Sequence, residues 1–269
     1  MSTAVADAEH LLAAAHALRD ALVPAGTRLA DPHTHLGLDE DGRSLAVDDL
    51  LASMAQSRVE RAYVFPLNEP DRRPRYEAPN DRVLEWAAGS DGRLVPLARL
   101  DLDDDPLVEL RRCLAKGARG VKLHPRAQAF RVDDDRLDPV FALAEEERLP
   151  ILIHAGRGMP PIGAHLARVA ERHPGAILIL AHAAIIDQEA IAGLMAGLPN
   201  VLFDTSTWSP LDIAGILELV PPEQVIWASD VPYGSHLSSI LAAGVALEEH
   251  GASDELRRAV LGGTTLGLM

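Results

Sequence analysis

Residues 28–35 read RLADPHTH, a strand-like stretch that ends in an Asp-x-His-x-His run. Side chains on a strand point alternately to its two faces, so His33 and His35 project together while Thr34 points away. Two imidazoles placed two residues apart on one rigid strand can bind a single divalent cation. The stretch therefore predicts a buried first strand that carries part of a metal site at its carboxyl end.

The rest of the chain repeats this arrangement of a short apolar run followed by a helical pattern. The apolar runs predict eight strands, at residues 28–35, 62–67, 94–101, 120–125, 151–156, 176–182, 201–205 and 225–230. Apolar residues at helical spacing predict eight helices, at residues 45–57, 80–88, 106–116, 138–148, 162–173, 188–198, 212–220 and 238–249.

Near-continuous apolar runs are typical of parallel strands that are buried on both faces. For a chain of 269 residues, the economical closure of eight strand-helix units is a (β/α)8 TIM barrel, an α/β fold. A doubly wound open sheet is the alternative, because periodicity alone does not establish closure. No linker rich in Pro, Gly or Ser divides the chain, so we expect one domain over residues 1–269.

The segment before the first strand is rich in Ala and Leu between residues 4 and 22, but charged residues interrupt it. It lacks a basic start and an unbroken apolar core, which argues against a signal peptide or a membrane span. We predict an amphipathic helix that covers one end of the fold and makes residues 1–26 an N-terminal helical extension. Such a helix could also serve a homodimer.

Composition limits the classes of partner. The net charge of −15 argues against binding to nucleic acid or to an anionic membrane surface, because phosphate binding needs a basic face. A small-molecule substrate is the better expectation. Cys113 is the one cysteine of the chain, so no internal disulfide can form and a reducing compartment, the cytoplasm, is predicted. Its helical context indicates a small buried side chain.

Polar residues cluster where the predicted strands end. In a TIM barrel, these carboxyl ends and the loops that follow them carry the active site. A lone histidine among apolar residues is usually a satisfied core residue, but here several titratable groups converge on one mouth of the barrel. They are His33, His35, Lys122, His124, His154, His182 and Asp230. Burying so many without a partner would be costly, and a divalent cation is a partner that satisfies the histidines and the aspartate together.

Imidazoles and a carboxylate without a thiolate favour zinc, with manganese, iron or cobalt as alternatives. Calcium and magnesium prefer sites built from oxygen ligands. An open coordination position would carry a water whose pKa the metal lowers towards neutrality. The ligand types therefore indicate hydrolytic chemistry.

The motifs resemble those of a known family. In order, they read DPHTH at residues 31–35, GVKLHP at 120–125, PILIHAG at 150–156, AH at 181–182 and ASDVP at 228–232. The chain is identified by them as a member of the amidohydrolase superfamily. It is similar to the amidohydrolase-2 branch of metal-dependent TIM-barrel hydrolases, which also contains decarboxylases related to aminocarboxymuconate-semialdehyde decarboxylase. The resemblance covers about residues 27–269.

The resemblance implies a role for each motif residue. His33, His35, His154 and Asp230 would bind one metal, and His182 would lie beside it. Asp230 would also accept the proton of the attacking water. His182 would stabilise the developing oxyanion or protonate the leaving group.

Lys122 has three possible roles. In binuclear superfamily members a carboxylated lysine on this strand bridges two metals, although the amidohydrolase-2 branch generally works with one. Lys122 could instead anchor a substrate anion or take part in a structural ion pair. We expect Lys122, His124 and Arg157 to bind substrate, because Arg157 follows His154 and could contact a substrate carboxylate.

Six further residues are weaker candidates. Asp204 ends the seventh strand and could hydrogen-bond a ligand histidine, and Asp31 could orient the histidines that follow it. Arg126 follows His124 and Pro125 and could contact a substrate carboxylate. Tyr233, Ser235 and His236 lie after the eighth strand and could touch substrate.

These features predict a metal-dependent hydrolase that uses a metal-activated water on a small amide, lactone or ester. The alternative is a non-oxidative decarboxylase of a small carboxylic acid with the same metal site. A third hypothesis is a metal-binding barrel that has lost catalysis, but such a chain would have no chemical need for the full ligand set.

Overall fold

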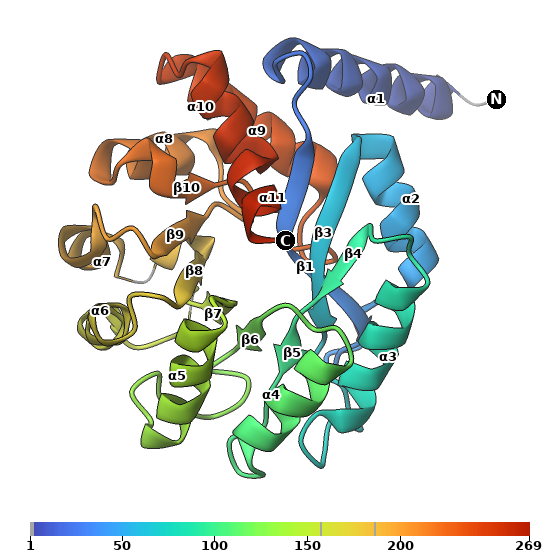
Figure 1. Ribbon diagram of the computed structural model, residues 1–269. Coiled ribbons are helices and arrows are strands. Elements are labelled where there is room, and N and C mark those ends of the chain that lie inside the picture. Colours follow the sequence, from blue (N-terminus) through green and yellow to red (C-terminus); the bar gives the residue numbers. More distant parts are fainter. Residues whose placement is uncertain (1–2, 157, 186) are drawn as a thin grey trace.

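The computed structural model describes residues 3–156, 158–185 and 187–269, and for residues 3–6 the backbone alone. Within these ranges, parallel strands form a ring whose outer side is covered by helices (Figure 1). The eight strand positions are β1 (Leu29–Leu38), β3 (Val59–Pro66), β4 with β5 (Leu94–Pro96 and Ala98–Arg99), β6 (Val121–Leu123), β7 (Pro150–His154), β8 (Ile177–Ala181), β9 (Val201–Asp204) and β10 (Val225–Ile226).

One helix follows each strand position, as the apolar spacing predicted. They are α2 (Val47–Ser57), α3 (Glu77–Ala88), α4 (Pro106–Ala115), α5 (Asp138–Glu146), α6 (Gly163–Arg172), α7 (Gln188–Met195), α8 (Pro210–Leu219) and α9 (His236–Glu249). Proline stands in the first turn of α4, α5 and α8, where its missing N–H leaves no hydrogen bond unmade. The alternation of strand and helix is the (β/α)8 order.

The strands pair in two sheets, ordered β2-β1-β3-β4 and β10-β9-β8-β7-β6-β5. The sheets join at Leu97, between β4 and β5. Its N–H donates to Val64 O at 2.8 Å on one side, while the N–H of Ala98 donates to Gly120 O at 2.9 Å on the other. One stretch of chain therefore pairs with both sheets.

The other edges of the two sheets meet where β1 passes the end of the eighth strand position. Thr34 and Val231 form a parallel bridge there. The N–H of Asp230 donates to His33 O at 2.9 Å, and the N–H of His35 donates to Val231 O at 2.8 Å. We call this contact between residues 33–35 and 230–231 the seam. With it, the predicted (β/α)8 TIM barrel is confirmed.

The eighth strand is shorter than predicted. β10 ends at Ile226, whereas the apolar run predicted a strand to Asp230. The N–H of Trp227 donates to Val260 O at 2.9 Å, so the backbone leaves the ladder at that point. A short β2 (Ser44–Leu45), which pairs antiparallel with the end of β1, was not predicted.

The inside of the barrel is filled by side chains and not by a channel. A core cluster separate from the outer, helix-facing core consists of Tyr63, Phe65, Val95, Leu97, Leu152, Ile179, Ala181, Leu202 and Ile226. The C-terminal helix α11 (Thr264–Leu268) lies within the outline of the ring (Figure 1), and Tyr63 Oη donates to Leu268 O at 2.6 Å. Neither α11 nor α10 (Asp254–Arg258) was predicted.

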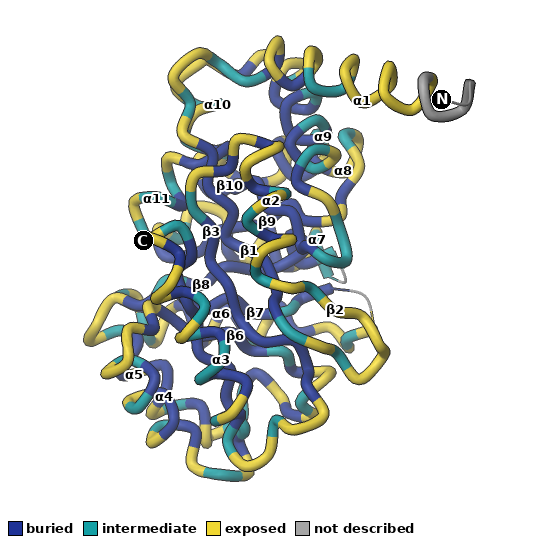
Figure 2. The backbone as a smooth tube through the Cα atoms, turned by 90° about the vertical axis from the view of Figure 1, so that its right-hand side faces the viewer, coloured by how far each residue is buried: buried dark blue, intermediate teal, exposed yellow. Residues whose placement is uncertain are grey.

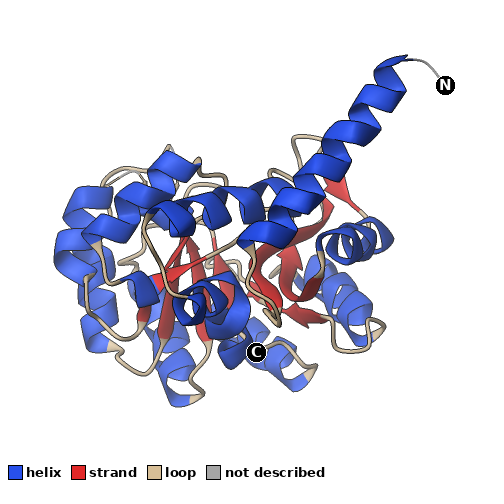
Figure 3. Ribbon diagram, turned by 90° about the horizontal axis from the view of Figure 1, so that it is seen from above, coloured by secondary structure: helices blue, strands red, loops and turns tan. Residues whose placement is uncertain are grey.

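Helix α1 (Thr3–Leu22) covers less of the fold than predicted. It projects beyond the barrel (Figure 3), and the side chains of residues 7–14 are exposed, as the yellow tube in Figure 2 shows. Only its last turns are anchored, where Leu22 packs against Gly244 of α9 and Arg19 donates to Gln56 O at 3.0 Å.

Cys113 is fully buried on α4, as predicted. Its thiol donates to Glu109 Oε1 at 3.1 Å, and burial raises the pKa of the thiol. No helix in the described part of the chain is long and apolar enough to cross a membrane.

Gly262, between α10 and α11, presses directly on the start of β1. A Cβ at this position would lie 2.1 Å from Arg28 O and 2.7 Å from Ala30 N, which are backbone atoms that cannot move aside. We therefore expect Gly262→Ala to lower the free energy of unfolding by about 2–3 kcal/mol, because overpacking forces the backbone to shift. Urea unfolding monitored by circular dichroism measures this.

Gly267→Ala is the matched control, because no heavy atom lies within 4 Å of a Cβ built at Gly267. Removing a helical glycine there should stabilise the protein by about 0.5–1 kcal/mol. Equal unfolding midpoints for the two variants would contradict the close approach at Gly262.

Candidate active site

A cavity of about 450 Å³ opens at the carboxyl ends of the strands. Seven of the candidate residues at strand ends line it, namely His33, His35, Lys122, His124, His154, His182 and Asp230, whereas Asp204 does not. Arg157 lies outside the described residues. The structure thus brings together side chains that are up to about two hundred positions apart in the chain.

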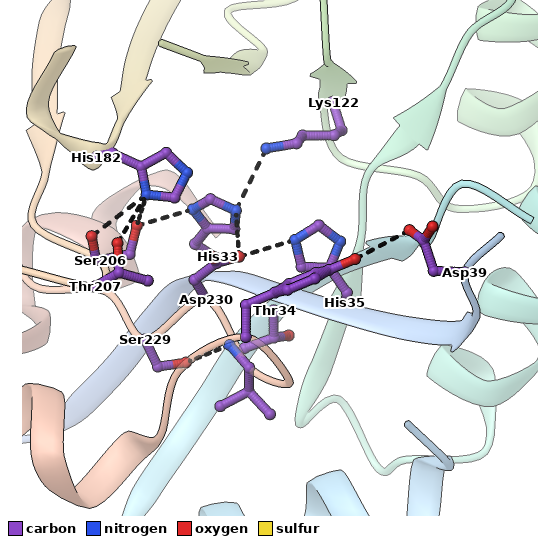
Figure 4. A network of polar contacts seen from close by, with 12 residues as sticks. His33, Thr34, His35, Asp39, Lys122, His182, Ser206, Thr207, Ser229 and Asp230 are labelled. Atoms are coloured by element: carbon purple, nitrogen blue, oxygen red, sulfur yellow. Dashed lines mark hydrogen bonds and ion pairs between the residues drawn. The ribbon is translucent and has the colours of Figure 1, made fainter. Parts of the chain in front are cut away.

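The tightest group in the cavity is formed by His33, His35 and Asp230. One ligand atom from each lies within 4.8 Å of the others, and all three residues are buried. Asp230 Oδ1 is 3.0 Å from His35 Nε2 and 3.2 Å from His33 Nε2 (Figure 4). The seam holds them in place, since the backbones of His33 and Asp230 are hydrogen-bonded to each other.

Asp204 orients the ring of His33 from the far side. Its Oδ2 lies 2.6 Å from His33 Nδ1, and its Oδ1 accepts the N–H of Ser206 at 2.7 Å. Burial raises the pKa of Asp204, while His182 and Ser206 act in the opposite direction. With Asp204 ionised, the hydrogen sits on Nδ1 and the lone pair of Nε2 points at Asp230. The predicted hydrogen bond between a candidate ligand histidine and Asp204, with the carboxylate as acceptor, is confirmed.

The protonation states in this group suit a metal. Burial lowers the pKa of His33 well below its ordinary value and that of His35 to about 4. For Asp230, burial acts to raise the pKa, but His33 and His35 lower it to about 2. Near neutral pH the group is therefore two neutral imidazoles and one carboxylate, the forms in which these side chains bind a divalent cation. A carboxylate oxygen facing an imidazole lone pair is an arrangement that a cation between them stabilises.

His154 lines the cavity but is not part of the tightest group. Its Nε2 is buried with no hydrogen-bond partner in the described chain, and its ring stacks on His124 at 3.9 Å between centroids. Gly156 makes this position possible, because a Cβ there would lie 2.6 Å from His182 Cδ2 and 2.8 Å from His154 Cε1. An unpartnered buried nitrogen that faces the cavity fits a further ligand.

His182 lies next to His154 and His33, with its ring centroid 5.0 Å and 5.4 Å from theirs. Its Nδ1 lies 3.0 Å from Ser206 Oγ and 3.4 Å from Thr207 Oγ1, which leaves Nε2 on the cavity side of the ring (Figure 4). His182 and Asp230 both have left-handed backbones, with φ of 58° and 59°. For a residue with a Cβ this costs about 1 kcal/mol, and such strain is common at functional sites.

Lys122 points into the group. Its Nζ lies 3.4 Å from His33 Nε2 and 4.8 Å from the centroid of the Phe65 ring. Burial lowers its pKa to about 7, against the opposing influence of Asp230. Within the described ranges, no carboxylate lies close enough to Lys122 for an ion pair, so a structural ion pair has no support. A role towards substrate or as a carboxylated bridge stays a prediction.

Of the weaker candidates, some lie at the cavity and others do not. The ring of Tyr233 lines the cavity, and its hydroxyl donates to Asp39 Oδ2 at 3.0 Å. The prediction for His236 is wrong, because this residue begins α9 fully buried, with Nδ1 2.8 Å from Ser53 Oγ, outside the cavity lining. Asp31 faces the seam, where its Oδ1 accepts the N–H of His33 at 2.9 Å.

Arg99 was not among the predicted site residues, yet it ends β5 and lines the cavity beside Lys122. Asp39, Asp41 and Asn68, which were not predicted either, also line it, as does the weaker candidate Arg126. A signal for Arg99 was present, because it is the one basic residue within the apolar run from Leu94 to Leu100.

The chain is similar to known proteins over nearly its whole length. The amidohydrolase family model, Amidohydro_2, matches residues 12–267. No curated protein matches the chain.

Solved structures share its fold at low identity. An uncharacterized TIM-barrel protein from Bordetella bronchiseptica is 16% identical, with a TM-score of 0.65 over 83% of this chain and 82% of that one. The 5-carboxyvanillate decarboxylase LigW from Sphingomonas paucimobilis is 16% identical, with a TM-score of 0.67 over 90% and 99%. A probable 2-pyrone-4,6-dicarboxylic acid hydrolase from Acinetobacter baumannii is 15% identical, with a TM-score of 0.66 over 90% and 98%.

The barrel and the family match together define a TIM-barrel enzyme of the amidohydrolase superfamily. Within it, the chain belongs to the amidohydrolase-2 family, as its motifs predicted. Enzymes of this family are generally metal-dependent and act on small molecules, and the group of His33, His35 and Asp230 could bind such a metal.

Proposed function

We propose that this protein is a metal-dependent hydrolase that attacks a small amide, lactone or ester with an activated water. The observation that carries the proposal is the position of Asp230 Oδ1, 3.0 Å from His35 Nε2 and 3.2 Å from His33 Nε2 in the lining of the cavity. His33, His35, Asp230 and His154 would hold the cation. The proposed ion is one zinc, with manganese, iron or cobalt as alternatives.

A divalent cation bound here would supply Lewis-acid chemistry and lower the pKa of a water. The side chains of the protein would transfer the proton and orient the ligands. Asp230, in contact with both histidines, is placed to accept the proton of the attacking water. Asp204 keeps the ring of His33 in one orientation through the 2.6 Å contact.

His182 is proposed to act on the substrate. Ser206 and Thr207 hold its Nδ1 side, so its Nε2 side is free to hydrogen-bond the developing oxyanion or to protonate the leaving group. We propose Lys122, His124 and Arg157 for substrate binding. The first two line the cavity.

A second candidate function is non-oxidative decarboxylation of a small carboxylic acid with the same residues. The similarity of fold to 5-carboxyvanillate decarboxylase favours it. In that reaction the same buried histidines and carboxylate would position the substrate and supply the proton that replaces carbon dioxide.

Metal analysis followed by assays separates these proposals. The purified protein is analysed by plasma mass spectrometry, stripped with a chelator, reloaded with zinc and tested on panels of amides, lactones, esters and carboxylic acids. Hydrolysis that disappears on stripping and returns on reloading is expected. Release of carbon dioxide selects the decarboxylase instead, and a zinc-loaded protein inert on every panel would contradict both.

Three further proposals, on domain organisation, localisation and oligomeric state, derive mainly from the amino-acid sequence. We propose that residues 1–269 act as one unit with residues 1–26 as an extension, that the protein works in the cytoplasm, and that it can form a homodimer. The single cysteine and the exposed side of α1 support the second and third of these.

A further inference from the structure

Arg99 is a buried cation in the cavity wall without a carboxylate partner. Its side chain is 2% exposed, and arginine is seldom buried to this degree unless it is paired. No ion pair to Arg99 exists among the residues that the structure describes, whereas surface arginines such as Arg82 have them. Leaving a charged group unpaired inside a protein is costly, so this position calls for a partner.

The contacts that Arg99 does make leave part of its guanidinium unused. Nη1 donates to Pro66 O at 3.0 Å, and the group lies 5.2 Å from the centroid of the Tyr76 ring. Nε has no hydrogen-bond partner in the described chain. A backbone oxygen and an aromatic face do not neutralise the charge, and donors remain for an anion.

The backbone fixes Arg99 at the cavity. Asn80 receives the N–H of Arg99 at 2.9 Å and donates to its carbonyl at 2.8 Å, so the end of β5 is clamped from α3. Arg99 pairs in register with Lys122 on β6, and side chains of paired residues lie on the same face of a sheet. Both side chains therefore face, and line, the cavity that contains the candidate metal ligands.

A carboxylate of the cavity itself does not take this role. Asp39 also lines the cavity, but its Oδ2 already accepts the hydroxyl of Tyr233 at 3.0 Å and the N–H of Asn68 at 3.1 Å. Asp230 is committed to His33 and His35. Asp39 and Glu69 act on the charge of Arg99, but neither forms an ion pair with it within the described residues, so an anion bound in the cavity would supply a direct partner.

We propose that Arg99 binds a carboxylate of the substrate that is separate from the group that reacts at Asp230 and His182. The substrate class is then a small acid that carries a free carboxylate as well as the bond to be cleaved. This inference rests on the proposed function, because it assumes that the substrate occupies this cavity. Guanidinium and carboxylate can form two parallel hydrogen bonds, which gives both affinity and orientation.

Binding of simple acids tests the inference without turnover. Benzoate carries one carboxylate, and the three benzenedicarboxylates, phthalate, isophthalate and terephthalate, carry two. Dissociation constants are measured by calorimetry on the zinc-loaded protein. At least one dicarboxylate should bind the wild type about 10- to 100-fold more tightly than benzoate, the range expected for charge-assisted hydrogen bonds.

Arg99→Met should abolish this preference and leave the zinc content unchanged. Arg99→Lys keeps the charge but loses the paired donors, so it should retain part of the preference and remain folded. The matched control is Arg28→Met, since Arg28 is exposed and paired with Glu60 away from the cavity. It should behave as the wild type.

The inference is overturned if no dicarboxylate is preferred by the wild type, or if the preference survives in Arg99→Met. Neither result bears on whether the zinc-loaded protein hydrolyses or decarboxylates, which is measured separately by the substrate panels. A protein inert on those panels that still prefers a dicarboxylate through Arg99 would contradict the proposed reaction and support the anchor.

Discussion

Asp230→Ala is expected to lose bound metal and turnover together, with turnover falling by about 10³-fold or more. Asp230 has two proposed tasks, since its Oδ1 lies within 3.2 Å of both candidate ligand histidines and it is also the acceptor for the proton of the attacking water. Alanine removes the negative charge that the cation needs and the base that the water needs. Metal content by plasma mass spectrometry and rates on the best substrate of the panel measure the two losses.

His33→Ala is a second route to the same result, because it removes another member of the group. Asp48→Ala is the control, since Asp48 is an exposed carboxylate on α2. It should keep both metal and activity. If Asp230→Ala and His33→Ala both retained stoichiometric metal, the proposed ligand set would be wrong.

His182→Asn is expected to keep the metal while turnover falls by about 10²- to 10⁴-fold, the usual effect of losing a positioned acid or base. His182 lies outside the group of His33, His35 and Asp230, so its loss leaves that group complete. Asparagine can still hydrogen-bond Ser206, but it cannot transfer a proton. Metal content and turnover are measured on the same preparation.

Loss of metal in His182→Asn would instead make His182 a ligand and would point to a site with two metals, where Lys122 could supply the bridge. His10→Asn is the control, because His10 is exposed on α1 and should affect neither quantity. An unchanged turnover with full metal content would remove His182 from the mechanism.

The fold could be predicted because each strand is an apolar run that ends at a polar or turn-forming residue. Besides the short β2, two features could not be predicted, and each has a physical reason. The strand at residues 225–230 breaks after Ile226, because Trp227 hydrogen-bonds to the C-terminal region, and that contact has no local sequence pattern. The helices α10 and α11 are five residues each, too short for apolar spacing to establish a helical period.

The members of the candidate site could be predicted by residue type, since histidine and aspartate are unusual in apolar runs. Their arrangement could not be predicted. Left-handed backbones at His182 and Asp230 are uncommon for residues other than glycine, so sequence gives no signal for them. The position of Arg99 in an apolar run is visible in the sequence, but its lack of a carboxylate partner is visible only in the structure.

Because two members of the candidate site meet at the seam, the site depends on closure of the barrel. His35 and Asp230 are 195 positions apart in the chain, yet they meet across the junction of the first and last strands of the barrel. The full group therefore exists only once the ring is closed, and a growing polypeptide has no complete site until nearly all of it has been synthesised. A cation that binds all three residues favours the closed ring over any open form, by an amount set by its affinity and free concentration. Such an ion would stabilise the closed barrel as well as take part in catalysis.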